Sequence, residues 1–346
     1  MNHADVTLEI STKDRYDILH LCLMSIANQT LLPREIIIYD DGECRDLRED
    51  YIYKGIFNIL NLKRVEWKVL RGKQKGQIYN HQQAIKDAKY DWIYRVDDDN
   101  ILEPNVLERL YSYTKDPTLG AVGGVVVHPE YLMPAQATSN RIEDCSAKYG
   151  AQFAGFPGVK EVDHLYSTFL YRKAAAKHGY PLYLSRIAHH EETIFSYEMK
   201  LAGWKLLVDG DTVTYHLRAP RGGIRSPGNE RELWESDNAT LQKKLKKWGI
   251  KPTEYFFMLN LHALGDNFIM KSILPEVRRK YPNKKIMIGT LFGGIYFDEP
   301  DVEAVVPEVV LVLSQIPAEH FDAYKYGFDH NWTGHMKDIY RRIYNL

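Results

Sequence analysis

Apolar residues gather in short runs along the first third of the chain, with polar turns between them. Strands that alternate with helices predict an α/β fold class with a mostly parallel sheet. Five runs have strand length and are rich in β-branched or aromatic residues: VTLEIS (6–11), EIIIYDDG (35–42), VEWKVL (65–70), WIYRV (92–96) and AVGGVVV (121–127). Three segments between them have apolar residues at helical spacing: 17–29, 77–88 and 104–114.

The periodicity weakens after Val127 and then recovers. Residues 128–158 predict a long loop, and residues 217–230, rich in Gly, Pro and Arg, predict a flexible one. The segments with a recovered pattern are a strand followed by a helix (164–179), a helix (191–203), a pair of strands (204–216) and a helix (231–248).

A second unit is expected from about Lys251 onward. There a strand pattern (254–261), a helix pattern (268–281) and another strand pattern (284–290) follow one another as a fresh βαβ start. A chain of 346 residues also exceeds the usual size of a single core. We therefore predict two domains, residues 1–250 and a smaller, partly Rossmann-like α/β unit at residues 251–346.

Net charge, cysteine number and apolar run length limit which partners and which cellular compartment are expected. The formal net charge is −1, so the chain lacks the basic field that attracts nucleic acid. The three cysteines form no metal-type pair, and their odd number argues against a disulfide framework. No apolar run reaches the length of a membrane span, and the N-terminus has no signal-peptide pattern. These features predict a cytoplasmic protein, while the pattern leaves the oligomeric state open.

Candidate chemistry lies where the predicted strands end, which is where ligands bind in α/β sheets. Polar clusters follow three strands: Ser11–Arg15, Asp40–Asp41 and Asp97–Asp99. The carboxylates of YRVDDDN (94–100) are suited to a hard divalent cation, which takes oxygen ligands from protein and substrate phosphates. The alternative is a solvated acidic turn that caps the following helix.

A second group of candidates lies further along the chain. Glu191 and Glu192 open a predicted helix, so they are either a general base with its neighbour or carboxylates that stabilise the helix terminus. His216 ends a predicted strand, and it is a candidate ligand because an acidic metal site needs further ligands.

Taken in chain order, these clusters resemble glycosyltransferase family 2, whose inverting members have the GT-A fold. The resemblance covers about residues 5–226. It rests on three stretches: VTLEISTKDRYDILHLCLMSIANQTLLPREIIIYDDG (6–42), YRVDDDNILEPNVL (94–107) and EETIFSYEMKLAGWKLLVDGDTVTYH (191–216).

The resemblance implies a reaction and a set of roles. A sugar passes from a nucleotide-diphosphate sugar, expected to be a UDP-sugar, to an acceptor hydroxyl of a glycan, a lipid-linked glycan or another molecule, by a single in-line displacement that inverts the anomeric centre. Asp97 and Asp99 form the D-x-D pair that binds Mn²⁺ or Mg²⁺, with His216 as a further ligand. Glu192 stands where the family usually has its catalytic Asp, and Glu191 is the rival base. The donor would contact Thr12, Arg15, Asp41, Asp97, Asp98 and Arg221.

The C-terminal segment has a resemblance of its own. MLNLHALGDNFIMKSILPEVRRKYPNKKIMIGT (258–290) is similar to the first βα unit of heptosyltransferase-like GT-B glycosyltransferases. Such enzymes need two Rossmann-like halves, so this unit would be a truncated second transferase or a docking module.

Two other functions fit the same acidic clusters. A nucleotidyltransferase that acts on a sugar phosphate also pairs carboxylates with a metal and a nucleotide, but STKDRYD (11–17) lacks the glycines of its phosphate loop. A non-catalytic nucleotide-sugar-binding module is the other alternative, and the intact acids at both motifs argue against it.

Overall fold

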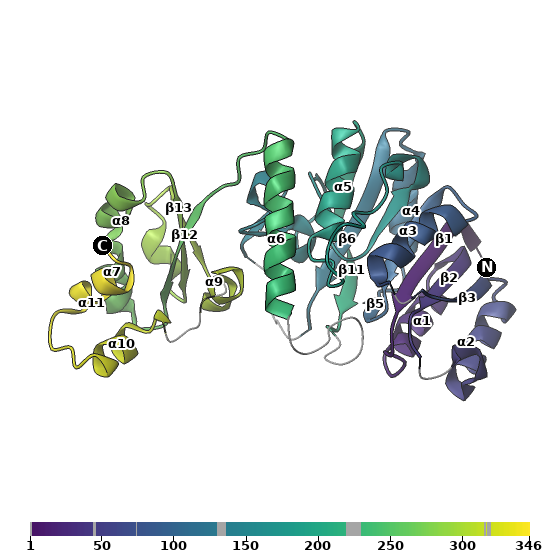
Figure 1. Ribbon diagram of the computed structural model, residues 1–346, viewed down its shortest axis with the longest axis horizontal. Coiled ribbons are helices and arrows are strands. Elements are labelled where there is room, and N and C mark those ends of the chain that lie inside the picture. The colour runs from purple at the N-terminus through teal and green to yellow at the C-terminus, as the bar shows by residue number, and fades with distance from the viewer. Residues whose placement is uncertain are drawn as a thin grey trace. The chain divides into compact units, whose positions relative to one another are not determined.

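The chain forms two compact units in the computed structural model, which describes residues 2–43, 46–73, 75–129, 136–218, 230–314, 316 and 320–346. The first unit consists of Met1–Pro134, Asn140–Ile142 and Gly150–Ile250. The second consists of Ala135–Ser139, Glu143–Tyr149 and Lys251–Leu346. The second unit thus takes in two short segments of the weakly periodic region, and Figure 1 shows the elements of both.

A curved, mixed sheet forms the centre of the first unit, with the strand order β3-β2-β1-β4-β10-β6-β11-β5 and β9 paired to β11. Strands β1, β2, β3 and β4 are parallel, as are β6 and β11, whereas β5, β9 and β10 run antiparallel to their neighbours. The prediction of an α/β fold with a mostly parallel sheet is confirmed. The strands are β1 (Asn2–Thr12), β2 (Leu31–Asp40), β3 (Glu66–Arg71), β4 (Trp92–Asp97), β5 (Asn100–Leu102), β6 (Leu119–Val127), β9 (Val159–Glu161), β10 (Phe169–Arg172) and β11 (Lys205–His216).

Helices cover both faces of this sheet (Figure 1). Side chains of α1, α2 and α4, among them Cys22, share one apolar cluster with alternate residues of the strands. Side chains of α3 and α5 join the cluster on the opposite face. The helices are α1 (Leu19–Ala27), α2 (Tyr51–Leu62), α3 (Gln77–Asp87), α4 (Val106–Ser112), α5 (Glu191–Leu201) and α6 (Glu230–Lys247).

Three of the differences between the structure and the predicted elements concern the first unit's longer segments. The predicted pair of strands at 204–216 is one long strand, β11, because a register shift between Asp209 and Val213 lets both halves pair with β6. After β10 the chain makes a 3-10 turn, Lys173–Ala176, instead of a helix. Helix α2 was not predicted, and its start is fixed by the Asp50 carboxylate, which accepts from the N–H groups of Ile52 and Tyr53.

The second unit has a parallel three-stranded sheet of order β12-β13-β14. The predicted helix 268–281 is wrong in its bounds, because α7 ends at Lys271 and α8 begins at Leu274. Ala137 and Ala147 belong to this unit's apolar core, and Lys148 pairs with Glu303 at 2.5 Å. The elements are β12 (Tyr255–Asn260), β13 (Lys285–Thr290), β14 (Val302–Val305), α7 (Leu264–Lys271), α8 (Leu274–Lys280), α9 (Pro307–Ser314), α10 (Ala323–Asp329) and α11 (Met336–Ile343).

Short elements complete the described chain. Across the described ranges, none of the helices combines the length and the apolar character that crossing a bilayer requires. The remaining elements are the strands β7 (Thr138–Ser139) and β8 (Tyr149–Gly150), and the 3-10 turns η1 (Leu47–Glu49), η2 (Tyr113–Lys115), η3 (Ile142–Asp144), η4 (Ala151–Phe153) and η6 (Gly293–Tyr296).

Candidate active site

The carboxyl ends of β1 and β4 meet because the two strands are parallel neighbours, with Ser11 paired to Asp97. This register brings the residues after each strand into contact. The Thr12 hydroxyl donates to Oδ2 of Asp98 at 2.7 Å, and Nη1 of Arg15 donates to Oδ1 of the same carboxylate at 2.9 Å. Two of the predicted donor-binding residues are thus tied directly to the acidic motif.

Asp98 and Asp99 are almost fully covered, with 4% and 2% of their surface exposed. Burial raises the pKa of Asp98 to about 6, although the Arg15 guanidinium acts in the opposite direction. Arg15 also reaches Oδ2 of Asp99 at 3.2 Å, so one cation serves two adjacent carboxylates. The repulsion between these acids is therefore only partly offset by protein groups.

His216 lies beside Asp99 because the end of β11 pairs with β5, with His216 opposite Asn100. Its Nε2 atom is 3.2 Å from Oδ1 of Asp99. Burial lowers the pKa of His216, but the hydrogen bond and the charge of Asp99 outweigh it and hold this pKa above its ordinary value. An imidazole and a carboxylate that are far apart in sequence thus form one pair.

Asp97 has different partners from Asp99. Its Oδ2 accepts from the Ser167 hydroxyl at 2.8 Å, and its Oδ1 accepts from Nη2 of Arg95 at 3.5 Å. The charge of Arg95 overcomes the effect of burial, so the pKa of Asp97 is below its usual value. The Asp97 carboxylate is thus bound by Ser167 and Arg95, whereas Asp99 is bound by Arg15 and His216.

The two glutamates at the start of α5 are in unequal environments. Both oxygens of Glu191 accept from Nη1 of Arg95, at 2.8 and 3.1 Å, and the side chain is fully buried. Glu192 keeps 19% of its side chain exposed, and its Oε1 lies 3.7 Å from Nη2 of Arg95. Burial raises the pKa of both carboxyls above their ordinary value, so solvent access rather than pKa separates Glu192 from Glu191.

The loop before α5 is held by α6. Buried Asp237 accepts from the N–H and hydroxyl of Ser185 and from the N–H of His189. His190 has a left-handed backbone, φ 67°, and its Nε2 lies 2.6 Å from Oδ1 of Asn238. These contacts fix the turn that delivers the glutamate pair to the site.

Asp41 lies at the end of β2, 3% exposed, where its N–H bonds to the carbonyl of Thr12. Its Oδ2 accepts from the N–H of Gly76 at 3.2 Å. A Cβ on Gly72 would lie 1.7 Å from Oδ1 of Asp41, so this close approach requires glycine. The predicted nucleotide-contacting carboxylate therefore has a fixed position next to Thr12.

One predicted site residue lies outside the described part of the chain, and two residues of the site were not predicted from the sequence. Arg221 lies outside the described residues. Arg95 and Ser167 were missed, although each contacts Asp97. The signal for Arg95 was present: a charged residue inside the apolar run WIYRV must find buried carboxylates. Ser167 carries no such signal, because a hydroxyl in the segment LYSTF is ordinary.

A divalent cation suits the chemistry of this site. Five carboxylates pair with two guanidinium groups, those of Arg15 and Arg95. The carboxylates are those of Asp97, Asp98, Asp99, Glu191 and Glu192. In the described part of the chain, no three side chains of the His, Cys, Asp and Glu types are already gathered as a metal site. Asp99 and His216 are in contact, and two protein ligands with substrate phosphates suffice for such a cation.

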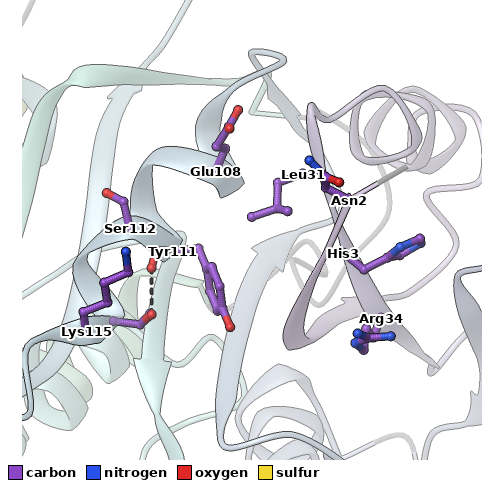
Figure 2. A pocket seen from close by; sticks show the side chains of 9 residues that line it. Asn2, His3, Leu31, Arg34, Glu108, Tyr111, Ser112 and Lys115 are labelled. Carbon is purple, nitrogen blue, oxygen red and sulfur yellow. Dashed lines mark hydrogen bonds between the residues drawn. The ribbon is translucent and has the colours of Figure 1, made fainter.

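A pocket of about 670 Å³ lies elsewhere in the first unit, where β1 and β2 begin. Figure 2 shows Asn2, His3 and Arg34 along one side and Tyr111 and Lys115 along the other. None of the residues that line it belongs to the predicted site. It lies at the amino end of the parallel strands, whereas ligands of such sheets bind at the carboxyl end.

Comparison with known proteins supports the fold. The structure of GalNAc-T7 with UDP, GalNAc and Mn²⁺ superposes with a TM-score of 0.51 at 14% identity, over 80% of this chain and 58% of that one. S. aureus TarS 1–349 superposes with a TM-score of 0.46 at 17% identity, over 63% of this chain and 60% of that one. The architecture is that of the GT-A glycosyltransferases.

Sequence comparison finds similarity over part of the chain. A protein named N-acetylglucosaminyltransferase from Bradyrhizobium elkanii is 34% identical over 112 residues, which are 31% of this chain and 57% of that protein. The chain thus matches little more than half the length of this relative. Residues 8–178, just under half of the chain, match the family model Glycosyl transferase family 2. Residues 8–178 are thus similar to glycosyl transferase family 2 domains, and the first unit has a GT-A fold.

Proposed function

We propose that the chain is an inverting glycosyltransferase that moves a sugar from a UDP-sugar to an acceptor hydroxyl. The observation that carries the proposal is the meeting of Thr12, Arg15, the Asp97–Asp99 motif and His216 at one edge of the sheet, with Glu191 and Glu192 linked to it through Arg95. The family-model match and the Mn²⁺ and UDP in the GalNAc-T7 structure support the same class of reaction.

Asp99 and His216 are the residues that would hold Mn²⁺ or Mg²⁺. When bound, such a cation supplies Lewis-acid stabilisation of the negative charge on the leaving diphosphate. Arg15 lies next to this pair and adds a fixed positive charge, while Thr12 and Asp41 lie where a nucleotide would be contacted. Asp97, held by Ser167 and Arg95, is the further carboxylate that would support such a cation.

Glu192 is the proposed general base. It is the partly exposed member of the glutamate pair, so an acceptor hydroxyl could reach its carboxylate and give up its proton there. Glu191 is fully buried and both its oxygens are bound by Arg95, so its carboxylate serves structure. In-line attack of the deprotonated acceptor on the anomeric carbon would invert its configuration.

The test is a donor panel. Hydrolysis and transfer are measured with UDP-GlcNAc, UDP-GalNAc, UDP-glucose and GDP-mannose, each with Mn²⁺ and with a chelator. We expect metal-dependent release of UDP from an N-acetylhexosamine donor, the sugar class named for the Bradyrhizobium relative. Tight binding of a donor without turnover under any condition would favour a non-catalytic binding module.

The C-terminal unit has no assigned role in this reaction. Its resemblance to heptosyltransferase-like enzymes stays a prediction, because the family-model match ends at residue 178. We propose that it is a docking module, with the donor site confined to the first unit.

A further inference from the structure

Arg95 is a fully buried cation in the middle of the central strand β4. Its neighbours in the strand, Tyr94 and Val96, are also fully buried. A guanidinium without water needs carboxylates and hydrogen bonds to offset the loss of hydration. The position therefore points to a specific role for its partners.

The partners of Arg95 come from two motifs that are 94 or more residues apart in the chain, the Asp97 motif and the start of α5. Nη1 binds both oxygens of Glu191, and Nη2 lies 3.5 Å from Asp97 and 3.7 Å from Glu192. The guanidinium carbon is 5.4 Å from the centre of the Phe169 ring and 5.8 Å from that of Tyr180. The guanidinium of Arg95 thus lies close to two aromatic rings and to three carboxylates.

The contacts of Arg95 place Glu191 and Glu192 in different environments. The two hydrogen bonds to Glu191 anchor the first residue of α5, and the helical backbone then fixes where the next side chain starts. Glu192 receives the charge of Arg95 at longer range and keeps access to solvent. The same guanidinium reaches Asp97, so the acceptor side and the donor side of the site share one rigid connection.

We propose that Arg95 is a positioning residue, which anchors Glu191 so that Glu192 is aimed at the acceptor hydroxyl in a fixed relation to Asp97. The inference rests on the proposed glycosyltransferase function and deepens it. Arg95 need not touch either substrate, because it acts through the two glutamates.

The test compares paired and single substitutions. Arg95→Met alone leaves Glu191 as a buried, unpaired charge, which can unfold a protein. The double variant Arg95→Met with Glu191→Met removes both charges at similar volume and is the informative one. Arg172→Met is the matched control, since Arg172 lies on the adjacent strand β10, stacks on Trp92 and donates to backbone carbonyls away from the acids.

We expect turnover to fall while donor binding stays nearly unchanged. In the double variant, kcat for transfer falls about 10- to 100-fold because the base is misplaced, while donor affinity by calorimetry changes less than about twofold. Arg95→Lys keeps the positive charge but loses the paired N–H groups of the guanidinium. Its kcat should therefore lie between the values of the double variant and the wild-type protein. Arg172→Met loses stability and keeps kcat.

The outcomes that overturn the inference are distinct from failure of the function. A folded double variant with wild-type kcat overturns the role of Arg95 while the transferase stands. A parallel loss of kcat in Arg172→Met overturns it too, because general destabilisation would then explain the effect. Absence of turnover in the wild-type protein with every donor of the panel overturns the proposed function, and the inference with it.

Discussion

The Nε2 atom of His216, at the end of β11, lies 3.2 Å from Oδ1 of Asp99, in the turn after β4. The two residues are 117 positions apart in the sequence, and the pairing of β11 with β5 brings them together. An imidazole nitrogen and a carboxylate oxygen are both ligand types that divalent cations take. The contact between His216 and Asp99 is therefore the centre of the proposed metal site.

Asp99→Asn should remove metal-stimulated turnover. Asp99 is 2% exposed, so the isosteric amide is chosen to keep its packing. Loss of one anionic ligand should lower kcat by at least about a hundredfold, because metal stabilisation of the leaving group supplies several kcal/mol. Turnover and Mn²⁺ affinity by calorimetry check the prediction. Asp5→Asn, at a carboxylate that is 64% exposed, is the control, and unchanged Mn²⁺ affinity in the Asp99 variant would remove the metal assignment.

Glu192→Gln should lower kcat for transfer by about two to four orders of magnitude, because the amide cannot take up a proton at neutral pH. Donor affinity should change little. Glu191→Gln should instead reduce stability, by about 1–3 kcal/mol, because it removes a charge from the buried contact with Arg95. The pair is measured by steady-state kinetics and urea unfolding. The reverse pattern would move the role of base to Glu191.

Gly72→Ala should displace Asp41, because the new Cβ would lie 1.7 Å from Oδ1 of that buried carboxylate. We expect a loss of about 1–3 kcal/mol in unfolding free energy and weaker donor binding. Gly55→Ala in α2 is the control, since a Cβ there meets nothing within 4 Å. It should raise stability by about 0.5–1 kcal/mol through helix propensity. Normal donor affinity in the Gly72 variant would argue that Asp41 does not contact the nucleotide.

Stability should fall as pH drops from about 7 toward 4, in part through His190. Burial lowers the pKa of His190 to about 4. The unfolded chain takes up this proton near its ordinary pKa of about 6.5, so acid favours the unfolded state over that whole window. The expected loss from this residue is about 2 kcal/mol between pH 7.5 and pH 5.

His190→Asn is the matched variant for that pH dependence. Asn tolerates the left-handed backbone at this position and does not titrate. Chemical denaturation at the two pH values should therefore show a smaller difference than in the wild-type protein. An identical difference would show that other groups, such as His189, whose pKa burial lowers to about 2, account for the acid sensitivity.

Much of the first unit could be predicted from local pattern. The runs of β2, β4 and β6 lie between polar turns, and their nearly continuous apolar residues predict strands that are buried on both faces. In β1 the apolar run is interrupted by Thr7 and Glu9, which are buried as well. Because parallel strands end at one edge, the acids after β4 and the polar residues after β1 could be placed near each other. The start of α5 at Glu191 was also evident from the sequence.

Other features depend on partners that are distant in the sequence. The run 204–216 reads as two strands, and only pairing with β6 keeps it as one. The stretch 268–281 reads as one helix, yet the structure divides it between α7 and α8. Helix α2 was missed although its signal was local: Tyr53, Ile56, Phe57 and Leu60 have helical spacing, and Asp50 caps its start.

The sequence by itself determined which residue types were available: an acidic triplet after a buried strand, a glutamate pair at a helix start and a histidine at a strand end. Residue chemistry alone could not rank Glu191 and Glu192, which have identical side chains, and only the family resemblance favoured Glu192. The tertiary structure decided that Arg95 binds Glu191 and leaves Glu192 exposed, and that His216 faces Asp99 while Asp97 turns to Ser167. The physical reason is that burial and charge pairing act through space, between strands and helices that the chain order separates.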